Sequence, residues 1–157
     1  MLVKDIIYED FINYKKASMT ISFPRCNWKC EKECGKQVCQ NGALAQAPDI
    51  EISIDKIIAR YLNNEIIKSV VLAGLDPMDS WSDLLLFVEK FRERSQDDIV
   101  IYTGYNRDEI ANKINILKRF PNIIVKFGRY IPGHKKHYDE VLGIELASDN
   151  QKAEVIS

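Results

Sequence analysis

All four cysteines of this 157-residue chain lie within fourteen positions, at Cys26, Cys30, Cys34 and Cys39. Secreted disulfide scaffolds spread their cysteines to join distant segments, whereas a tight group of cysteines is typical of metal binding or catalysis. Iron–sulfur clusters accept varied cysteine spacing, because each thiolate binds a different iron. Three thiolates on a four-iron cluster would leave one iron open for a substrate or a cofactor. The spacing therefore favours an iron–sulfur site.

A structural zinc loop in a non-catalytic interaction module is the alternative from a different class of function. Structural zinc sites usually combine two C-x2-C turns, but the gaps between the cysteines here are three, three and four residues long. The zinc alternative also leaves the unusual segments after the later strands unexplained. Iron and sulfide in anaerobically purified protein would exclude it, whereas a colourless zinc protein would support it.

The cysteines belong to a long loop, residues 24–51, that follows a predicted strand from Met19 to Phe23. Apolar and polar residues alternate in this strand. Short continuous apolar segments predict three more strands, of the kind that is covered on both faces. Two late segments, 141–146 and 153–156, are possible short strands. The three continuous segments are Val70–Ala73, Ile99–Tyr102 and Ile123–Phe127.

Helices are predicted between these strands. Ser53 precedes an apolar stripe at helical spacing, and two sequence patterns resemble capping boxes, Ser80 with Asp83 and Asn106 with Glu109. Strands that alternate with helices indicate βαβ units and a mostly parallel sheet. A complete eight-fold barrel needs about 250 residues, more than this chain has. We therefore predict one α/β domain over residues 1–157, with a parallel sheet that is open or curved into a (β/α) half-barrel.

Four unusual segments follow the four predicted strands. Ligands of parallel sheets bind beyond the carboxyl ends of the strands, so these segments should converge at one edge. They are the cysteine loop, Gly74-Leu-Asp-Pro77, Thr103-Gly-Tyr105 and Gly128-Arg-Tyr130.

The overall composition excludes several classes of protein. The 22 Lys and Arg residues nearly balance the 23 Asp and Glu residues, for a net charge of −1, so no strong field points to nucleic acid or an anionic membrane. With 46% hydrophobic residues the chain does not have the composition of a disordered protein. No apolar run approaches the ~20 residues of a membrane-spanning helix. We expect a soluble, cytoplasmic protein with no nucleic-acid or membrane partner.

The segment Cys26-Asn-Trp-Lys-Cys30, closed by Cys39-Gln-Asn41, resembles the cluster motif of radical S-adenosylmethionine (SAM) enzymes. Ala73-Gly-Leu-Asp-Pro77 resembles the Gly-Gly-Glu/Asp-Pro segment that these enzymes place after their second strand. Residues 98–105 and 147–151 resemble segments of the anaerobic ribonucleotide reductase activating proteins, which are small members of this superfamily. The resemblance covers roughly residues 17–156.

The cysteine loop departs from the usual spacing of the superfamily, which is C-x3-C-x2-C. After Cys30 the next gap is three residues to Cys34 or eight to Cys39. We choose Cys39, because Gln-Asn and an apolar Ala43-Leu44 pair follow it and can dock on the body of the fold. Doubling the length of a loop costs only about 0.6 kcal/mol. Residues 31–38 would then be an insertion, and Cys34 remains the alternative third ligand.

The resemblance implies a [4Fe-4S] cluster held by Cys26, Cys30 and Cys39, with SAM on the open iron. One electron would cleave SAM to methionine and a 5′-deoxyadenosyl radical. Gly74 would let the backbone approach SAM closely, and Asp76 would face its amino group. Val38 stands where the family commonly has an aromatic residue against the adenine. The predicted contacts to SAM are Val38, Ala73, Gly74, Leu75, Asp76 and Thr103.

The resemblance also implies partners. The protein substrate would be a glycyl-radical enzyme such as anaerobic ribonucleotide reductase, and a flavodoxin or ferredoxin would supply the electron. A radical SAM enzyme that modifies a small molecule or a peptide is the alternative within the same chemistry. Co-purification with a reductase that gains a radical would discriminate the two.

Overall fold

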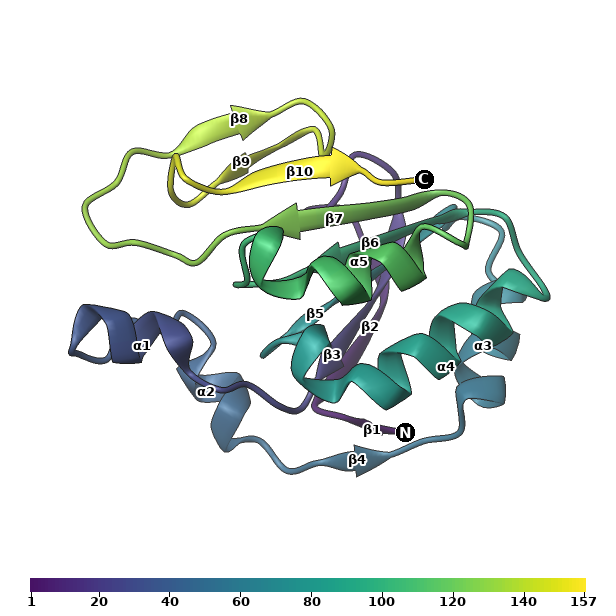
Figure 1. Ribbon diagram of the computed structural model, residues 1–157. Helices are drawn as coiled ribbons and strands as arrows, with labels where there is room; N and C mark the ends of the chain where they lie inside the picture. The colour runs from purple at the N-terminus through teal and green to yellow at the C-terminus, as the bar shows by residue number, and fades with distance from the viewer.

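A six-stranded sheet in the order β10-β7-β6-β5-β3-β2 forms the centre of the molecule (Figure 1). The computed structural model describes all residues from Met1 to Ser157. The four inner strands run parallel to one another, and the two edge strands, β2 and β10, run antiparallel to their neighbours. The strands are β2 (Asp5–Asp10), β3 (Ser18–Phe23), β5 (Ser69–Gly74), β6 (Asp98–Tyr102), β7 (Ile123–Phe127) and β10 (Lys152–Val155).

Two small two-stranded sheets lie outside this centre. One joins β1 (Leu2–Val3) to β4 (Ile50–Glu51), and the other joins β8 (His137–Asp139) to β9 (Ile144–Leu146). The helices are α1 (Lys29–Cys34), α2 (Gly42–Gln46), α3 (Ile54–Leu62), α4 (Trp81–Arg92) and α5 (Ala111–Leu117), with short 3-10 turns η1 (Pro77–Ser80) and η2 (Asp108–Ile110). None of the helices is long and apolar enough to cross a membrane.

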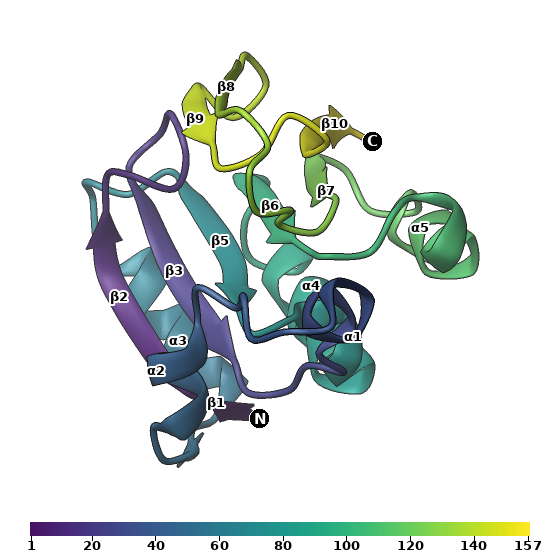
Figure 2. The same cartoon turned by 90° about the vertical axis from the view of Figure 1, so that its left-hand side faces the viewer.

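The two faces of the sheet are covered differently (Figures 1 and 2). Helices α3, α4 and α5 cover one face and enclose a core of 24 buried residues. Across the sheet, a smaller cluster of seven includes Tyr14, Leu142 and Leu146, which come from the β2–β3 connection and the β8–β9 region. Burial on both sides explains why the inner strands β5, β6 and β7 are largely continuous apolar runs rather than alternating ones.

The helix boundaries test the predicted caps. Ser53 caps α3 as predicted, because its hydroxyl accepts a hydrogen bond from the Lys56 amide at 3.3 Å. Glu109 accepts one from the Asn106 amide at 2.7 Å, which is half of a capping box. The predicted Ser80 cap is wrong, because the Ser80 hydroxyl makes no hydrogen bond. The chain instead enters α4 through η1, whose first turn is capped by Asp76.

The predicted α/β class with a mostly parallel sheet is confirmed, and so are the four inner strands. The segment 153–156 corresponds to β10, and only the end of 141–146 forms a strand, β9. The edges β2 and β10 do not pair with each other, so no closed barrel forms. The half-barrel shape stays a prediction.

Candidate functional site

The four segments that follow the inner strands converge at one edge of the sheet, as predicted. Two backbone hydrogen bonds join the first pair of segments: Leu75 N donates to Phe23 O at 3.1 Å, and Asp76 N donates to Arg25 O at 2.8 Å. In Figure 2 the cysteine loop, with α1 and α2, passes in front of this edge. The cysteine-bearing segment therefore lies beside the ends of β5, β6 and β7.

All four cysteines are free and half-buried. Cys30 and Cys34 lie one turn apart on α1, and Cys39 lies in the turn before α2. Two of the sulfurs accept backbone hydrogen bonds: Trp28 N donates to Cys26 Sγ at 3.3 Å, and Asn41 N donates to Cys39 Sγ at 3.4 Å. Hydrogen bonds of this kind stabilise a thiolate and tune the potential of an iron–sulfur cluster. The donor set fits such a cluster.

Burial raises the pKa of two of the thiols. The pKa of Cys26 is raised to about 11, with smaller contributions from Asp76, Asp79 and Cys30. Burial also raises the pKa of Cys30, with a smaller contribution from Cys39. A metal deprotonates the thiols that it binds, so loading this site would release protons.

The backbone between the first two cysteines has an unusual conformation. Trp28 lies in the left-handed region, with φ 59° and ψ 33°, at the N-terminus of α1. A non-glycine residue seldom takes this conformation, which costs about 1–2 kcal/mol. It turns the chain into α1 just after the Trp28 amide, which donates to the Cys26 sulfur. Strain of this kind is often found at functional sites.

Side-chain hydrogen bonds fasten both ends of the cysteine segment to the sheet. At its start, the Asn27 amide donates to Asp79 Oδ2 at 2.8 Å, and Tyr105 OH donates to the other oxygen of Asp79 at 2.7 Å. The Asn27 side chain also bonds to Tyr105 OH. At its end, Asn41 Nδ2 donates to Gly74 O at 2.8 Å. The turn that carries Cys39 is thereby held at the end of β5.

The structure brings the predicted cofactor residues Asp76 and Thr103 into contact. Both carboxylate oxygens of Asp76 lie 3.0 Å from Thr103 Oγ1, and they also accept hydrogen bonds from the Met78 and Gly104 amides at 3.0 Å. Asp76 is 4% exposed, and burial raises its pKa to about 6. A carboxylate offers about four acceptor positions. Three donors of the chain itself, the Thr103 hydroxyl and two amides, occupy most of them, so Asp76 joins the ends of β5 and β6.

Packing within the sheet requires a glycine at position 74. Its φ is +90°, and a Cβ atom on it would lie 2.6 Å from the Phe23 amide nitrogen and 2.7 Å from Ser22 Cα. The close approach of β5 to β3 therefore requires a glycine here, and the predicted approach of the backbone to SAM stays a prediction.

The remaining predicted contacts lie on the same edge of the sheet. Ala73 is the penultimate residue of β5 and packs against the smaller apolar cluster. Leu75 follows β5 and is half-buried. Val38 is half-buried in the turn that carries Cys39.

An ion-pair network was not foreseen from the sequence. Glu109 accepts hydrogen bonds from Lys29 on α1 and from Arg129 in the segment after β7, whose Nη2 lies 2.6 and 2.7 Å from the two carboxylate oxygens. Arg129 Nε lies 3.4 Å from Glu33 Oε1, also on α1. Hydrogen bonds to Arg129 and Lys29 lower the pKa of Glu109 to about 2. The sequence singled out the Gly128-Arg-Tyr130 segment and Glu109 separately, but only the fold brings them together.

The late segment 147–151 supports the turn after β7. Gln151 Nε2 and Lys126 Nζ donate to Gly128 O at 3.3 and 2.9 Å, and Asn150 Nδ2 donates to Arg129 O at 2.8 Å. These bonds orient the backbone that carries Arg129.

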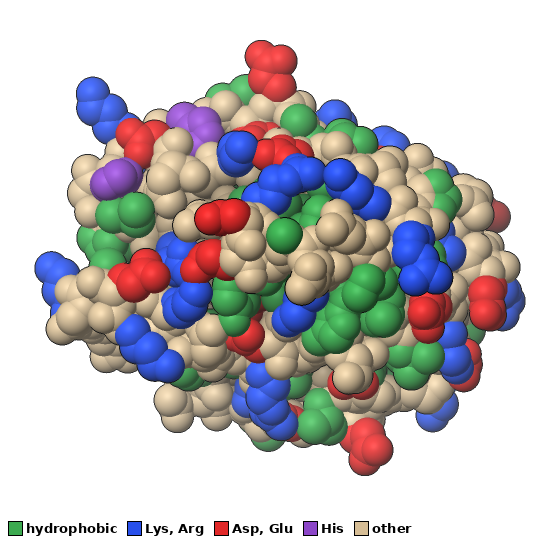
Figure 3. All heavy atoms as spheres, in the orientation of Figure 1, with side chains coloured by type: hydrophobic (Ala, Val, Ile, Leu, Met, Phe, Trp, Pro, Cys, Tyr) green, Lys and Arg blue, Asp and Glu red, His purple; other side chains and the backbone are tan.

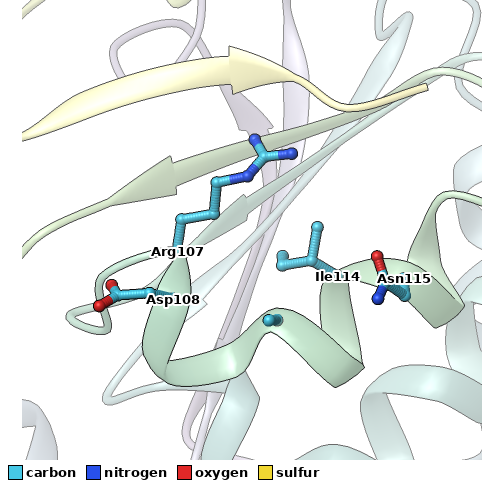
Figure 4. A pocket seen from close by; sticks show the side chains of 5 residues that line it. Arg107, Asp108, Ile114 and Asn115 are labelled. Atoms are coloured by element: carbon cyan, nitrogen blue, oxygen red, sulfur yellow. The ribbon is translucent and has the colours of Figure 1, made fainter.

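The surface near the site carries mixed charge and shallow hollows. Acidic and basic side chains are interspersed on the face seen in Figure 3. A pocket of about 360 Å³ lies along α5, lined by residues such as Arg107 and Ile114 (Figure 4). A second pocket, of about 310 Å³, borders the cysteine loop at Pro24 and Arg25. Neither pocket is lined by a cysteine.

The comparison with protein families bears on the choice between the two metals. The family described as the 4Fe-4S single cluster domain matches residues 17–152, which include all four cysteines and the parallel strands. The chain belongs to this family. The match favours the iron–sulfur interpretation of this 4Fe-4S domain over a zinc loop. No curated protein and no solved structure matches the chain.

Proposed function

We propose that this 4Fe-4S domain is a radical SAM enzyme, in which Cys26, Cys30 and Cys39 bind three irons of the cluster and the fourth iron is open to SAM. The observation that carries the proposal is the position of Cys39. Asn41, two residues after Cys39, fastens its turn to Gly74 O at the end of β5. The turn that carries Cys39 therefore lies at the edge of a parallel sheet, where ligands of such sheets bind.

Cys34 lies outside this group in our proposal. It is the last residue of α1, and Gly35 ends the helix in the left-handed conformation. Residues 31–38 then form an insertion between the second and third ligands.

The residues after β5 and β6 support SAM by shaping the edge of the sheet. Asp76, whose oxygens already bind the Thr103 hydroxyl and two backbone amides, acts as a positioning residue for the Thr103-Gly104 turn. The proposed SAM-contacting surface comprises Val38, Ala73, Gly74, Leu75 and the turns that the buried Asp76–Thr103 pair positions. When bound, the cluster supplies the electron that cleaves SAM to methionine and a 5′-deoxyadenosyl radical.

We further propose a glycyl-radical enzyme of the anaerobic ribonucleotide reductase type as the protein substrate, with a flavodoxin or ferredoxin as electron donor. The similarity of residues 98–105 and 147–151 to the activating proteins supports this choice. In the structure these residues form β6 with its turn and the segment that holds the turn after β7, both at the proposed site.

The test compares two single variants in anaerobically purified, reconstituted protein. Cys39→Ala should lose the iron, the sulfide and the reductive cleavage of SAM, whereas Cys34→Ala should keep all three. The reverse result would make Cys34, instead of Cys39, the third ligand of the cluster. Loss in both variants would mean a cluster closed by four cysteines, and an iron-containing parent that cleaves no SAM would refute the radical SAM proposal.

The substrate is tested with the same preparation. Incubation with a glycyl-radical reductase and SAM should produce the electron paramagnetic resonance signal of a glycyl radical. SAM cleavage without a radical on the reductase would favour the small-molecule or peptide alternative.

A further inference from the structure

We propose that Glu109 is a positioning residue that holds α1, and with it Cys30, against the edge of the sheet through Lys29 and Arg129. This inference rests on the proposed cluster site, because it explains how one of the cluster-binding helices is oriented. It adds a group of residues that lies far from the cysteines in the sequence.

Helix α1 needs an anchor of this kind because it has no apolar one. It is six residues long, and none of its residues is buried. Helices this short are not stable alone in water, and most helices in proteins are held by an apolar face. Since α1 has no such face, polar contacts to the body of the fold must set its orientation.

The contacts to Glu109 come from both sides of the site. Lys29, at the first position of α1, forms an ion pair with one carboxylate oxygen. Arg129 Nη2 reaches both oxygens, at 2.6 and 2.7 Å. Arg129 is 8% exposed and Asn150 fixes its loop, so the arginine side chain is a fixed anchor for the network. The Arg129–Glu109 bonds are partly buried and therefore stronger than an exposed ion pair, whereas the Lys29–Glu109 pair is exposed at Lys29.

A second contact from Arg129 reaches the next turn of α1. Its Nε atom is buried and has no hydrogen bond, and it faces Glu33 Oε1 at 3.4 Å. A small movement of α1 toward the sheet would complete this bond. Lys29 and Glu33 flank Cys30, so the two contacts together determine where the Cys30 sulfur points.

The chain provides a matched control in a second ion pair. Arg107, two residues before Glu109, pairs with Glu154 on β10 and does not involve α1. Glu154→Gln therefore removes an acidic partner at the same end of α5 without touching the cysteine loop. Glu109→Gln keeps an oxygen for the Asn106 amide but removes the charge, and Glu109→Asp keeps the charge on a shorter side chain.

The first measurement is hydrogen exchange in the protein without metal. In Glu109→Gln, exchange at the amides of α1 should become several-fold faster, while α4 stays protected. Glu154→Gln should match the parent, and Glu109→Asp should lie between. Equal α1 exchange in Glu109→Gln and the parent would overturn the inference, whether or not the protein binds a cluster.

The second measurement uses reconstituted protein under anaerobic conditions. A chelator should remove iron from Glu109→Gln about tenfold faster than from the parent, as expected for loss of a partly buried charged contact. High salt should accelerate release from the parent more than from Glu109→Gln. Release at the parent's rate from Glu109→Gln would overturn the inference. A parent without iron would refute the proposed function alone, and the exchange measurement would still decide the role of Glu109.

Discussion

The helix-covered body of the fold and the cysteine loop are stabilised in different ways. In the body, α3, α4 and α5 bury 24 residues against one face of the sheet. In the loop, neither α1 nor α2 has a buried residue. The loop is held by polar side chains such as Asn27, Lys29 and Asn41. The difference implies that changes in the loop affect the site with little effect on global stability, whereas changes in the body unfold both.

The largest effect should come from a cavity in the body. Phe87 is fully buried and stacks on Phe91 with ring centroids 5.7 Å apart. Phe87→Ala should lower the free energy of unfolding by about 3–5 kcal/mol, because it removes apolar contacts and leaves a cavity. Urea denaturation of the metal-free protein measures this. Lys32→Ala on the exposed side of α1 is the control, with a change within about 0.5 kcal/mol. An equal loss in the control would show that the loop unfolds together with the body.

A buried lysine in the body should make stability depend on pH. Lys126 is 7% exposed, and burial lowers its pKa from 10.5 to about 8. Between pH 8 and 10.5 the unfolded chain therefore binds more protons at this residue than the folded chain does. The contribution of Lys126 to the free energy of unfolding thus rises with pH across this window, by about 3 kcal/mol at most.

Lys126→Met isolates this contribution. The difference in unfolding free energy between the parent and Lys126→Met should shift in favour of the parent as the pH rises from 8 to 10.5. Urea denaturation at several pH values measures the difference. A pH-independent difference would mean that Lys126 keeps an ordinary pKa in the folded protein.

Gly74 lies where the body meets the site. Gly74→Ala should destabilise the protein by about 2 kcal/mol or more, because its φ is +90° and the added Cβ meets the backbone of β3. Gly104→Ala is the matched control, since its nearest atom would be Asp76 Oδ2 at 3.6 Å, an ordinary contact. Thermal unfolding of both variants tests this. Equal stability of Gly74→Ala and the parent would show that β5 and β3 separate at this end, and that their packing does not require the glycine.

The sequence predicts the body better than the site, for a physical reason. Apolar periodicity reports burial, and burial positions β5, β6, β7 and the main helices. Strand β2 lacks that signal, because five of its six residues are not fully buried. Helices α1 and α2 lack it as well. Their lengths and anchors depend on polar contacts between residues far apart in the chain.

The same reason limits what can be predicted within the site. Parallel strands place Asp76 and Thr103 at one edge, so their proximity is predictable from the order of elements. The sequence does not predict that the oxygens of Asp76 accept hydrogen bonds from the chain itself. The Met78 and Gly104 amides reach Asp76 only in the folded turn. Glu109 and Arg129 are likewise distant in the sequence and come into contact only in the folded chain.

The smallest effect on stability, and the sharpest test of the loop, concerns Trp28. Its left-handed backbone turns the chain into α1 between the first two cysteines, just after the amide that donates to the Cys26 sulfur. Glycine adopts this conformation without strain, whereas a β-branched residue resists it strongly. Trp28→Gly and Trp28→Val should therefore both leave the free energy of unfolding within about 0.5 kcal/mol of the parent, as expected for a loop outside the core. They should differ in iron content after reconstitution, with Trp28→Gly close to the parent and Trp28→Val depleted. Iron and sulfide analysis of the two variants provides the comparison. Equal depletion in both would assign the role to the indole ring instead of the backbone, since the ring is what both variants lack.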